Sequence, residues 1–273
     1  MPSTGSSSAK GRRLERCCRF MSIEACAALV ERADPDRFLT VMAAPEADRP
    51  KLLPLYAFNI EVSRAPWVTE EPMIAEMRLQ WWRDAVEEIA KGGEVRSHEV
   101  VDPLCDVARN ADLRTALLDQ MVAARRWDIY KDAFEDRAHL DEYIDQTSGN
   151  LMWCAARTLG AGRALEQPVR DFAYGAGVAG LLRAAAELDA RGRKPLLDGT
   201  HAGVAALATE ALARMTEVRV PKTIAPALWP GWQAQKLLTR AVKEPSLVAD
   251  GALQLSEFTR RWGLLRRQML GQI

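Results

Sequence analysis

Apolar residues recur at steps of three and four along most of the chain, and this period constrains the fold more than any other feature. One stripe comprises Ile74, Met77, Trp81, Ala85 and Ile89. Three more stripes repeat it: Leu113, Leu117, Met121 and Ala124; Leu140, Ile144, Thr147, Leu151, Cys154 and Thr158; Leu255, Phe258, Trp262, Leu265 and Met269. Each is typical of one apolar face of an amphipathic helix. Because no period-2 run lies between turn residues, the sequence predicts an all-α protein.

The predicted helices are separated by residues that start or stop helices. Pro72 and Pro168 stand where a first helical turn would begin, which proline tolerates. Gly92-Gly93 and Gly160-Ala-Gly162 follow predicted helix ends. Residues 194–203 are the most loop-like interior stretch, but we do not interpret them as a domain boundary. We predict one helical domain over residues 22–273.

Residues 1–21 are interpreted as an N-terminal tail. Residues 2–20 are rich in Ser and Arg, with Glu15 as their only acid. This composition resembles a mitochondrial transit peptide. A disordered tail, or a start codon assigned too early with Met21 as the true start, is the favoured interpretation, since no convincing amphipathic helix precedes Met21.

Composition excludes several classes of protein. The 273 residues include 37 Lys+Arg and 37 Asp+Glu, so no net charge attracts the chain to nucleic acid. The five cysteines form no C-x-x-C pair and the three histidines are far apart, which argues against a zinc site. No run approaches the roughly 18–20 apolar residues of a membrane-spanning helix, although a peripheral membrane contact stays open.

Two strings invite a ligand-binding interpretation. Gly175-Ala-Gly-Val-Ala-Gly180 matches G-x-G-x-x-G, but a dinucleotide site needs this string between a strand and a helix. Residues 168–190 read as one helix instead, so we expect these glycines to allow close packing or to give a ligand room. Met77-Arg-Leu-Gln-Trp-Trp-Arg-Asp84 reads as helix, with Trp81 on the buried stripe and Trp82 about 100° around from it. Core packing with solvated arginines is the simplest interpretation of that string.

In combination, several strings resemble the squalene/phytoene synthase family, in order and spacing, from about Asp34 to near the C-terminus. The strings that carry the resemblance are Tyr56-Ala-Phe58, Arg78-Leu-Gln-Trp-Trp-Arg83, Tyr143 with Thr147-Ser-Gly149, Leu181-Leu-Arg183 and Arg191-Gly-Arg193. The resemblance implies an isoprenoid-synthase-like helical bundle around a central apolar cavity. It also implies head-to-head joining of two prenyl diphosphates, with Mg²⁺ held by two D-x-x-x-D motifs.

The sequence departs from the family at those acidic motifs. Counted without gaps from the matching strings, the four aspartates fall on Ser63, Trp67, Ala184 and Leu188. Mg²⁺ prefers hard oxygen ligands, which alanine and leucine side chains do not offer. The resemblance therefore predicts degenerate metal positions, no catalytic residue and no cofactor, with Mg²⁺ needed only if the chain is an enzyme after all.

The same resemblance predicts which residues lie near a pocket, if one exists. The candidate pocket residues are Tyr56, Glu61, Arg78, Trp82, Arg83, Thr147, Gly149, Arg183 and Glu187. Each of them also has a purely structural interpretation. An enzyme with displaced acids would use Glu61, Glu76, Asp84 and Glu187 as its metal ligands.

A divergent branch of the family is a closer match. Ala57-Phe58-Asn59-Ile60-Glu61-Val62, Met77-Arg-Leu-Gln-Trp-Trp82 and Glu244-Pro-Ser-Leu247 resemble the branch that includes a mitochondrial complex I assembly factor and its bacterial relatives. This implies a non-catalytic role in building NADH dehydrogenase, with complex I subunits or assembly proteins as partners. An active prenyltransferase using farnesyl or geranylgeranyl diphosphate, and a carrier of a prenyl, lipid or quinone ligand, are the alternatives. We expect a bacterial cytoplasmic location or, alternatively, the mitochondrial matrix or inner-membrane periphery.

Overall fold

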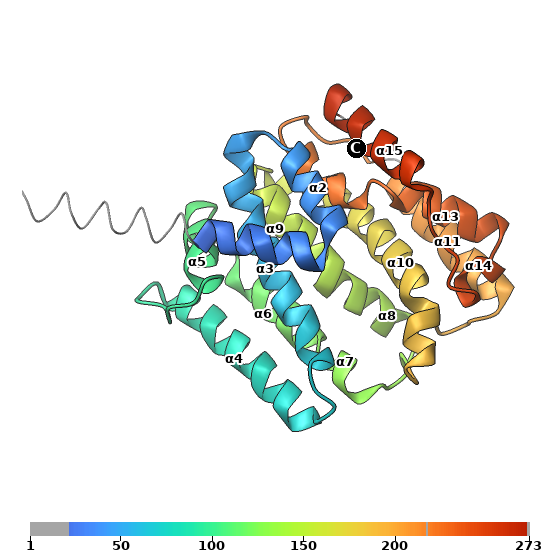
Figure 1. Cartoon of the computed structure of the whole chain (residues 1–273), viewed down its shortest axis with the longest axis horizontal. Coiled ribbons are helices and arrows are strands. Elements are labelled where there is room, and N and C mark those ends of the chain that lie inside the picture. The colour runs from blue at the N-terminus through green and yellow to red at the C-terminus, as the bar shows by residue number, and fades with distance from the viewer. Residues whose placement is uncertain (1–21, 217, 272–273) are drawn as a thin grey trace, which may run out of the picture.

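A computed structural model describes residues 22–216 and 218–271, and its regular elements are all helices, as predicted (Figure 1). Residues 22–33 form the first helix. The named helices are α2 (Pro35–Ala43), α3 (Arg49–Arg64), α4 (Pro72–Lys91), α5 (Val101–Asn110), α6 (Thr115–Ala124), α7 (Trp127–Tyr130), α8 (Arg137–Ile144), α9 (Asn150–Thr158), α10 (Glu166–Ala190), α11 (His201–Thr216), α12 (Ala225–Leu228), α13 (Ala234–Lys243), α14 (Ser246–Ala249) and α15 (Glu257–Leu270). Short 3₁₀ turns cover Glu46–Asp48, Ala65–Trp67, Arg163–Leu165 and Trp229–Gly231, and a π-helix, Asp145–Gly149, joins α8 to α9.

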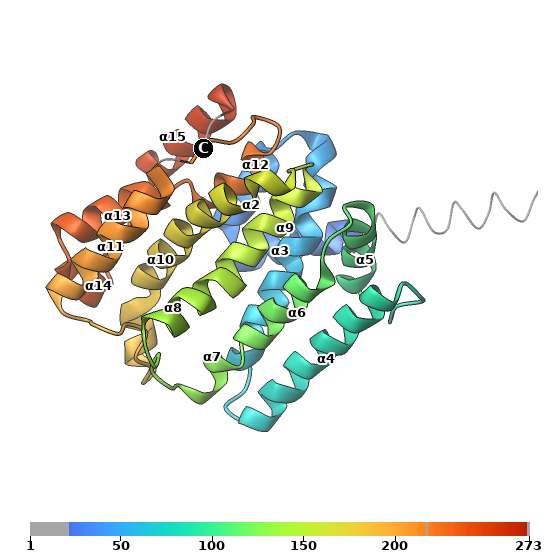
Figure 2. The same ribbon diagram turned by 180° about the vertical axis from the view of Figure 1, so that it is seen from behind.

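The core lies around α9, every residue of which from 150 to 156 is buried. α3, α6 and α10 pack against α9 (Figure 2). On the far side of α10, α11 and α13 form an outer layer, whereas α4 covers α6 on the opposite side. Trp153, Tyr56 and Phe58 are the largest fully buried side chains of this interior.

The predicted helix boundaries agree with the structure in most places. Pro72 is the first residue of α4, and Gly92 ends that helix in the left-handed conformation. The glycine string lies inside the unbroken helix α10, and no strand precedes it in the described residues. The loop after α10 is shorter than predicted, because α11 already begins at His201.

The predicted buried face of α4 is wrong in the N-terminal half of the helix. Ile74 and Met77 are exposed, at 45% and 66%, and Trp81 is only half-buried. Leu79 and Trp82 are buried instead, so the two tryptophans exchange their predicted places. The helix carries two apolar stripes offset by about one residue, and the neighbouring helices cover the second one.

The predicted face of α15 is also wrong. Phe258, Trp262, Leu265 and Met269 are all exposed, whereas Gly263 and Leu264 are buried. α15 packs against α2 and presents these four apolar side chains outward.

Candidate functional site

Trp67 is the last residue of the 3₁₀ turn that follows α3, and two arginines approach its ring. Gly192 turns the chain sharply after α10, with φ = 79°, a conformation that favours glycine. This turn brings the guanidinium carbons of Arg193 and Arg191 to 4.4 and 5.1 Å from the Trp67 ring centroid. Cation–π attraction stabilises this arrangement. The surroundings of Trp67 are therefore positively charged.

Beneath Trp67 is a buried charge cluster, which comprises Arg125, Asp128, Tyr143 and Arg193. Arg125 donates hydrogen bonds to the Asp128 carboxylate (3.2 Å) and to the Tyr143 hydroxyl (2.8 Å). The Tyr143 hydroxyl lies 3.1 Å from an Asp128 oxygen, and its burial raises the pKa of Tyr143 above its usual range. α7, α8 and the turn after α10 thus meet at one carboxylate.

Arg193 is the least satisfied member of this charge cluster. Its side chain is only 2% exposed, and its Nη1 atom lies 3.7 Å from the nearest Asp128 oxygen. Neither Nε nor Nη1 has a hydrogen-bond partner among the described residues. With two arginines and one carboxylate, the charge cluster has an excess of positive charge. Such a cluster can attract an anionic oxygen, but it repels a divalent cation.

The other degenerate metal positions offer little oxygen. Ser63 donates a hydrogen bond to the Ile60 carbonyl at 3.1 Å, and Ala184 and Leu188 are half-buried. Within residues 22–216 and 218–271, no three His, Cys, Asp or Glu side chains converge as a metal site would require. The residues present at these four positions do not fit a magnesium cluster.

Three of the predicted pocket residues lie together. Glu61, Arg78 and Trp82 line a pocket of about 330 Å³ between α3 and α4, with His98 beside them. The His98 ring packs against the edge of Trp82, with 5.4 Å between ring centroids. Arg183 lines a different pocket of about 500 Å³, which α2 and α13 help to form.

The remaining predicted pocket residues are dispersed. Tyr56 is buried inside α3, and its hydroxyl has no hydrogen-bond partner in the part of the chain that the structure describes. Burial raises the pKa of Tyr56 above its usual range. Arg83 binds Asp119 on the outside of the bundle at 2.7 Å. Glu187 is exposed and pairs with Arg191. Thr147 donates to the Tyr143 carbonyl at 2.6 Å, in the turn before Gly149.

The displaced acids proposed for an enzyme also lie in different places. Glu76 accepts hydrogen bonds from Arg126 and Tyr130 on α7. Asp84 accepts one from Gln80 on its own helix at 2.7 Å. Neither lines the pocket that contains Glu61.

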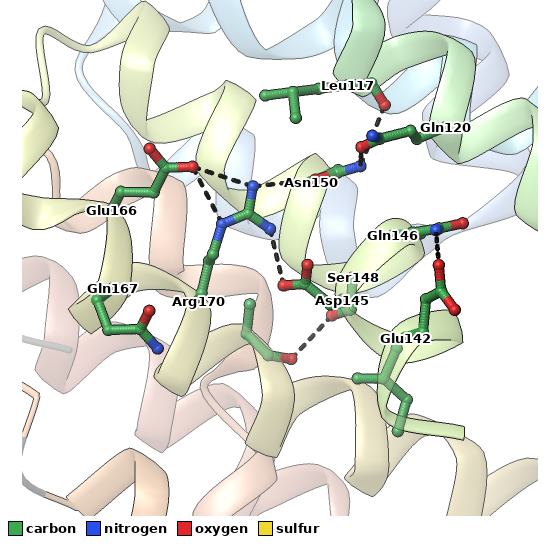
Figure 3. Close-up of polar contacts among 12 residues, drawn as sticks. Leu117, Gln120, Glu142, Asp145, Gln146, Ser148, Asn150, Glu166, Gln167 and Arg170 are labelled. Atoms are coloured by element: carbon green, nitrogen blue, oxygen red, sulfur yellow. Dashed lines mark hydrogen bonds and ion pairs between the residues drawn. The ribbon is translucent and has the colours of Figure 1, made fainter. Parts of the chain in front are cut away.

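A polar network around Arg170 is a feature that the sequence did not reveal (Figure 3). Arg170 donates to Asp145 of the π-helix at 2.7 Å, to Asn150 at 3.1 Å and to Glu166 at 3.2 Å. From the sequence, only Glu166 and Arg170 could be recognised as an ion pair, because they are four residues apart on one predicted helix. π-helical turns are frequent at functional sites, because the inserted residue re-aims side chains. Here the inserted turn directs Asp145 at Arg170.

Gly149 lies where the π-helix approaches this network. A Cβ atom added there would lie 2.6 Å from the Asp145 carboxylate and 3.3 Å from an Arg170 nitrogen. The predicted pocket residue Gly149 thus has a structural reason to be glycine.

One ion pair fixes the segment that carries His98. The Arg96 guanidinium donates to the Glu88 carboxylate through Nε and Nη2, with the shortest hydrogen bond at 2.6 Å, and the Arg96 backbone nitrogen donates to it as well. These bonds lower the pKa of Glu88 from 4.5 to about 2. The pair therefore stabilises the fold above pH 4.5, and this stability is lost as the pH falls toward 2.

We expect Glu88→Gln to lower the melting temperature by a constant amount above about pH 4.5, with a difference that shrinks toward pH 2. Thermal melts of both proteins between pH 2 and pH 8 measure this. The control is Glu87→Gln, which removes the exposed partner of Lys91 on the same helix. A Glu88→Gln difference that does not vary with pH would contradict the assignment.

A family model and two solved structures are similar to this chain over most of its length. The family model described as squalene/phytoene synthase matches residues 30–227. Among solved structures, a dehydrosqualene synthase in complex with ligand superposes with a TM-score of 0.77 over 92% of this chain and 97% of that chain, at 16% identity. A squalene synthase from Alicyclobacillus acidocaldarius gives a TM-score of 0.61 over 92% of this chain and 94% of that chain, at 14% identity.

Curated relatives carry a different description. The chain is 33% identical, over 132 residues (46% of its length and 39% of the relative), to the NADH dehydrogenase (ubiquinone) complex I assembly factor 6 homolog of Drosophila melanogaster. It is 24% identical over 135 residues (50% and 40%) to complex I assembly factor 6 of Homo sapiens. The match thus spans about two fifths of these relatives. The family match covers more than two thirds of the chain, which belongs to the squalene/phytoene synthase family.

Proposed function

We propose that this chain is a non-catalytic member of the squalene/phytoene synthase family that acts in the assembly of respiratory complex I (NADH dehydrogenase). The similarity to complex I assembly factor 6 of Drosophila melanogaster carries the assembly part of the proposal. Complex I subunits or other assembly proteins would be its partners. The chain would work in a bacterial cytoplasm or, alternatively, in the mitochondrial matrix.

The environment of Trp67 supports the non-catalytic part of the proposal. Counted without gaps from Tyr56-Ala-Phe58, the family resemblance assigns Trp67 to a position where the family's enzymes have a magnesium-binding aspartate. Here an indole ring contacts Arg193 and Arg191, and the charge cluster beneath it has a positive excess. Magnesium would meet cations where it needs carboxylates, so ionisation of an allylic diphosphate would lack its electrophile.

An active prenyltransferase is the second candidate, and the dehydrosqualene synthase superposition favours it. That superposition supports the fold at 16% identity, and a shared fold is weak support for shared chemistry. The candidate also needs carboxylates to converge, and Glu61, Glu76, Asp84 and Glu187 lie apart. We therefore place it second.

Deletion of the encoding gene tests the assembly role. Membranes from the deletion strain are expected to lose most NADH dehydrogenase activity, and native gels should reveal incomplete complex I. Succinate dehydrogenase activity in the same membranes is the control, because it reports on the respiratory chain without complex I. A plasmid copy of the gene should restore the activity. Normal NADH dehydrogenase activity in the deletion strain would contradict the proposal.

A second measurement tests the absence of catalysis. The purified chain is incubated with farnesyl or geranylgeranyl diphosphate and Mg²⁺, and pyrophosphate release is followed. We expect no release above that of a sample without protein. Release that depends on the protein would overturn the non-catalytic part and would leave the assembly part to the deletion experiment.

A further inference from the structure

α15 presents an apolar stripe to solvent. Phe258, Trp262, Leu265 and Met269 follow each other at steps of four, three and four, and so they share one helix face. They are 77%, 56%, 44% and 76% exposed. The Phe258 and Trp262 rings are parallel, with centroids 6.4 Å apart. Large apolar side chains in a contiguous exposed row mark an interaction surface.

The opposite face of α15 is fixed to the bundle. Gly263 and Leu264 are buried, and the Trp232 indole donates a hydrogen bond to the Arg260 carbonyl at 3.1 Å. An ion pair joins Arg260 to Asp36 of α2. Both views place α15 at one edge of the molecule (Figures 1 and 2). The stripe is therefore held outward on a helix that is anchored from behind.

Positive charge accompanies the stripe. α15 contains four arginines, Arg260, Arg261, Arg266 and Arg267, and one acid, Glu257. Arg261 pairs with Glu257 and Arg260 pairs with Asp36, whereas Arg266 is exposed and Arg267 donates to the Gly263 carbonyl. The exposed Lys222 lies beside Gly271 at the end of the helix. Basic residues thus flank an apolar face that contains a tryptophan.

A second exposed apolar patch, on α4, has more acidic than basic neighbours. Met73, Ile74 and Met77 are 74%, 45% and 66% exposed. Glu70, Glu71 and Glu76 lie near them in the sequence, and Arg78 is the nearest basic residue. Acidic residues beside an apolar patch repel an anionic membrane, so charge distinguishes the two patches.

We infer that α15 docks this chain on the surface of an anionic lipid bilayer. Helices that lie in the plane of a membrane surface combine an apolar face with Lys or Arg and often with Trp. Phe258, Trp262 and Met269 would enter the boundary between headgroups and acyl chains, while Arg261 and Arg266 would contact anionic headgroups. Among residues 22–216 and 218–271, no helix combines the length and the hydrophobicity of a membrane-spanning segment. The inference does not depend on the role in complex I assembly.

Vesicle co-sedimentation tests this inference. The full chain is mixed with vesicles of phosphatidylcholine alone or of phosphatidylcholine and phosphatidylglycerol in a 3:1 ratio. We expect binding to the anionic vesicles that weakens with salt, and much weaker binding to the neutral ones. The double variant Phe258→Ser with Trp262→Ser should have an affinity for the anionic vesicles that is lower by a factor of about ten or more. Arg266→Glu should also weaken binding, and only to the anionic vesicles.

A matched control uses the patch on α4. Met73→Ser with Met77→Ser removes two side chains of similar exposure and should leave vesicle binding unchanged. Circular dichroism melts identify any variant that has lost its fold. If the double variant unfolds, the binding of Arg266→Glu to anionic vesicles still tests the inference, because Arg266 is exposed. The inference is overturned if the wild-type chain ignores anionic vesicles. It is also overturned if the α15 variants bind the vesicles as the wild-type chain does. The same holds if light scattering shows that the chain associates with itself through α15 and the chain does not bind vesicles.

Discussion

Replacing Asp128 with alanine is expected to lower the free energy of unfolding by about 3–5 kcal/mol. The substitution removes the one carboxylate of the buried charge cluster and leaves Arg125 and Arg193 facing each other without a counter-charge. The side chains of Asp128 and Arg193 are only 6% and 2% exposed, so water cannot replace the lost interaction. The Tyr143 hydroxyl would lose a partner as well.

Urea unfolding, followed by tryptophan fluorescence, measures this loss. The matched control is Asp119→Ala, which breaks the two hydrogen bonds to Arg83 on the outside of the bundle. Both partners of that pair are 38% exposed, so its loss should cost about 1 kcal/mol or less. Equal losses for the two variants would mean that the charge cluster does not have the predicted importance.

The buried charge cluster illustrates what the sequence could not predict. Arg125 and Asp128 are three residues apart, but Tyr143 and Arg193 come from α8 and from the turn after α10, so no local spacing connects all four. Arg193 belongs to a short basic string after α10, and its burial depends on the turn at Gly192. Periodicity describes one helix at a time, whereas this cluster depends on how separate helices meet.

The helices themselves could be predicted because their signals are local. Pro72 and Gly92 mark the two ends of α4 through backbone conformation alone. The choice of buried face was less secure, because α4 carries apolar residues on two adjacent stripes. Trp81 and Trp82 were assigned to the wrong sides for this reason. On α15 the larger stripe is the exposed one, which no rule of core formation predicts.

The candidate pocket could be predicted only in part. Glu61, Arg78 and Trp82 do line one pocket, although they come from two helices. Arg183 lines another, and the polar network of Arg170 had no signal beyond one helical pair. The resemblance identifies these residues along the sequence, but the distances between their side chains depend on how the helices pack.

The glycine string of α10 provides the second large effect, because its three glycines have different surroundings. An alanine Cβ at Gly177 would lie 2.7 Å from Ile144 Cγ2 and 3.0 Å from Ser148 Cβ. Ile144 is β-branched, so its side chain has little freedom to move away. Gly177→Ala is therefore expected to lower the free energy of unfolding by about 1–3 kcal/mol, although alanine is the better helix former.

Gly180→Ala is the matched control, three residues later on the same helix. Apart from its own helix backbone, nothing among the described residues lies within 4 Å of the added Cβ, so only the gain in helix propensity remains. We expect stabilisation by about 0.5–1 kcal/mol. Urea unfolding of both variants should therefore give shifts of opposite sign. Stabilisation by both substitutions would indicate that α10 does not approach the π-helix as closely as the structure has it.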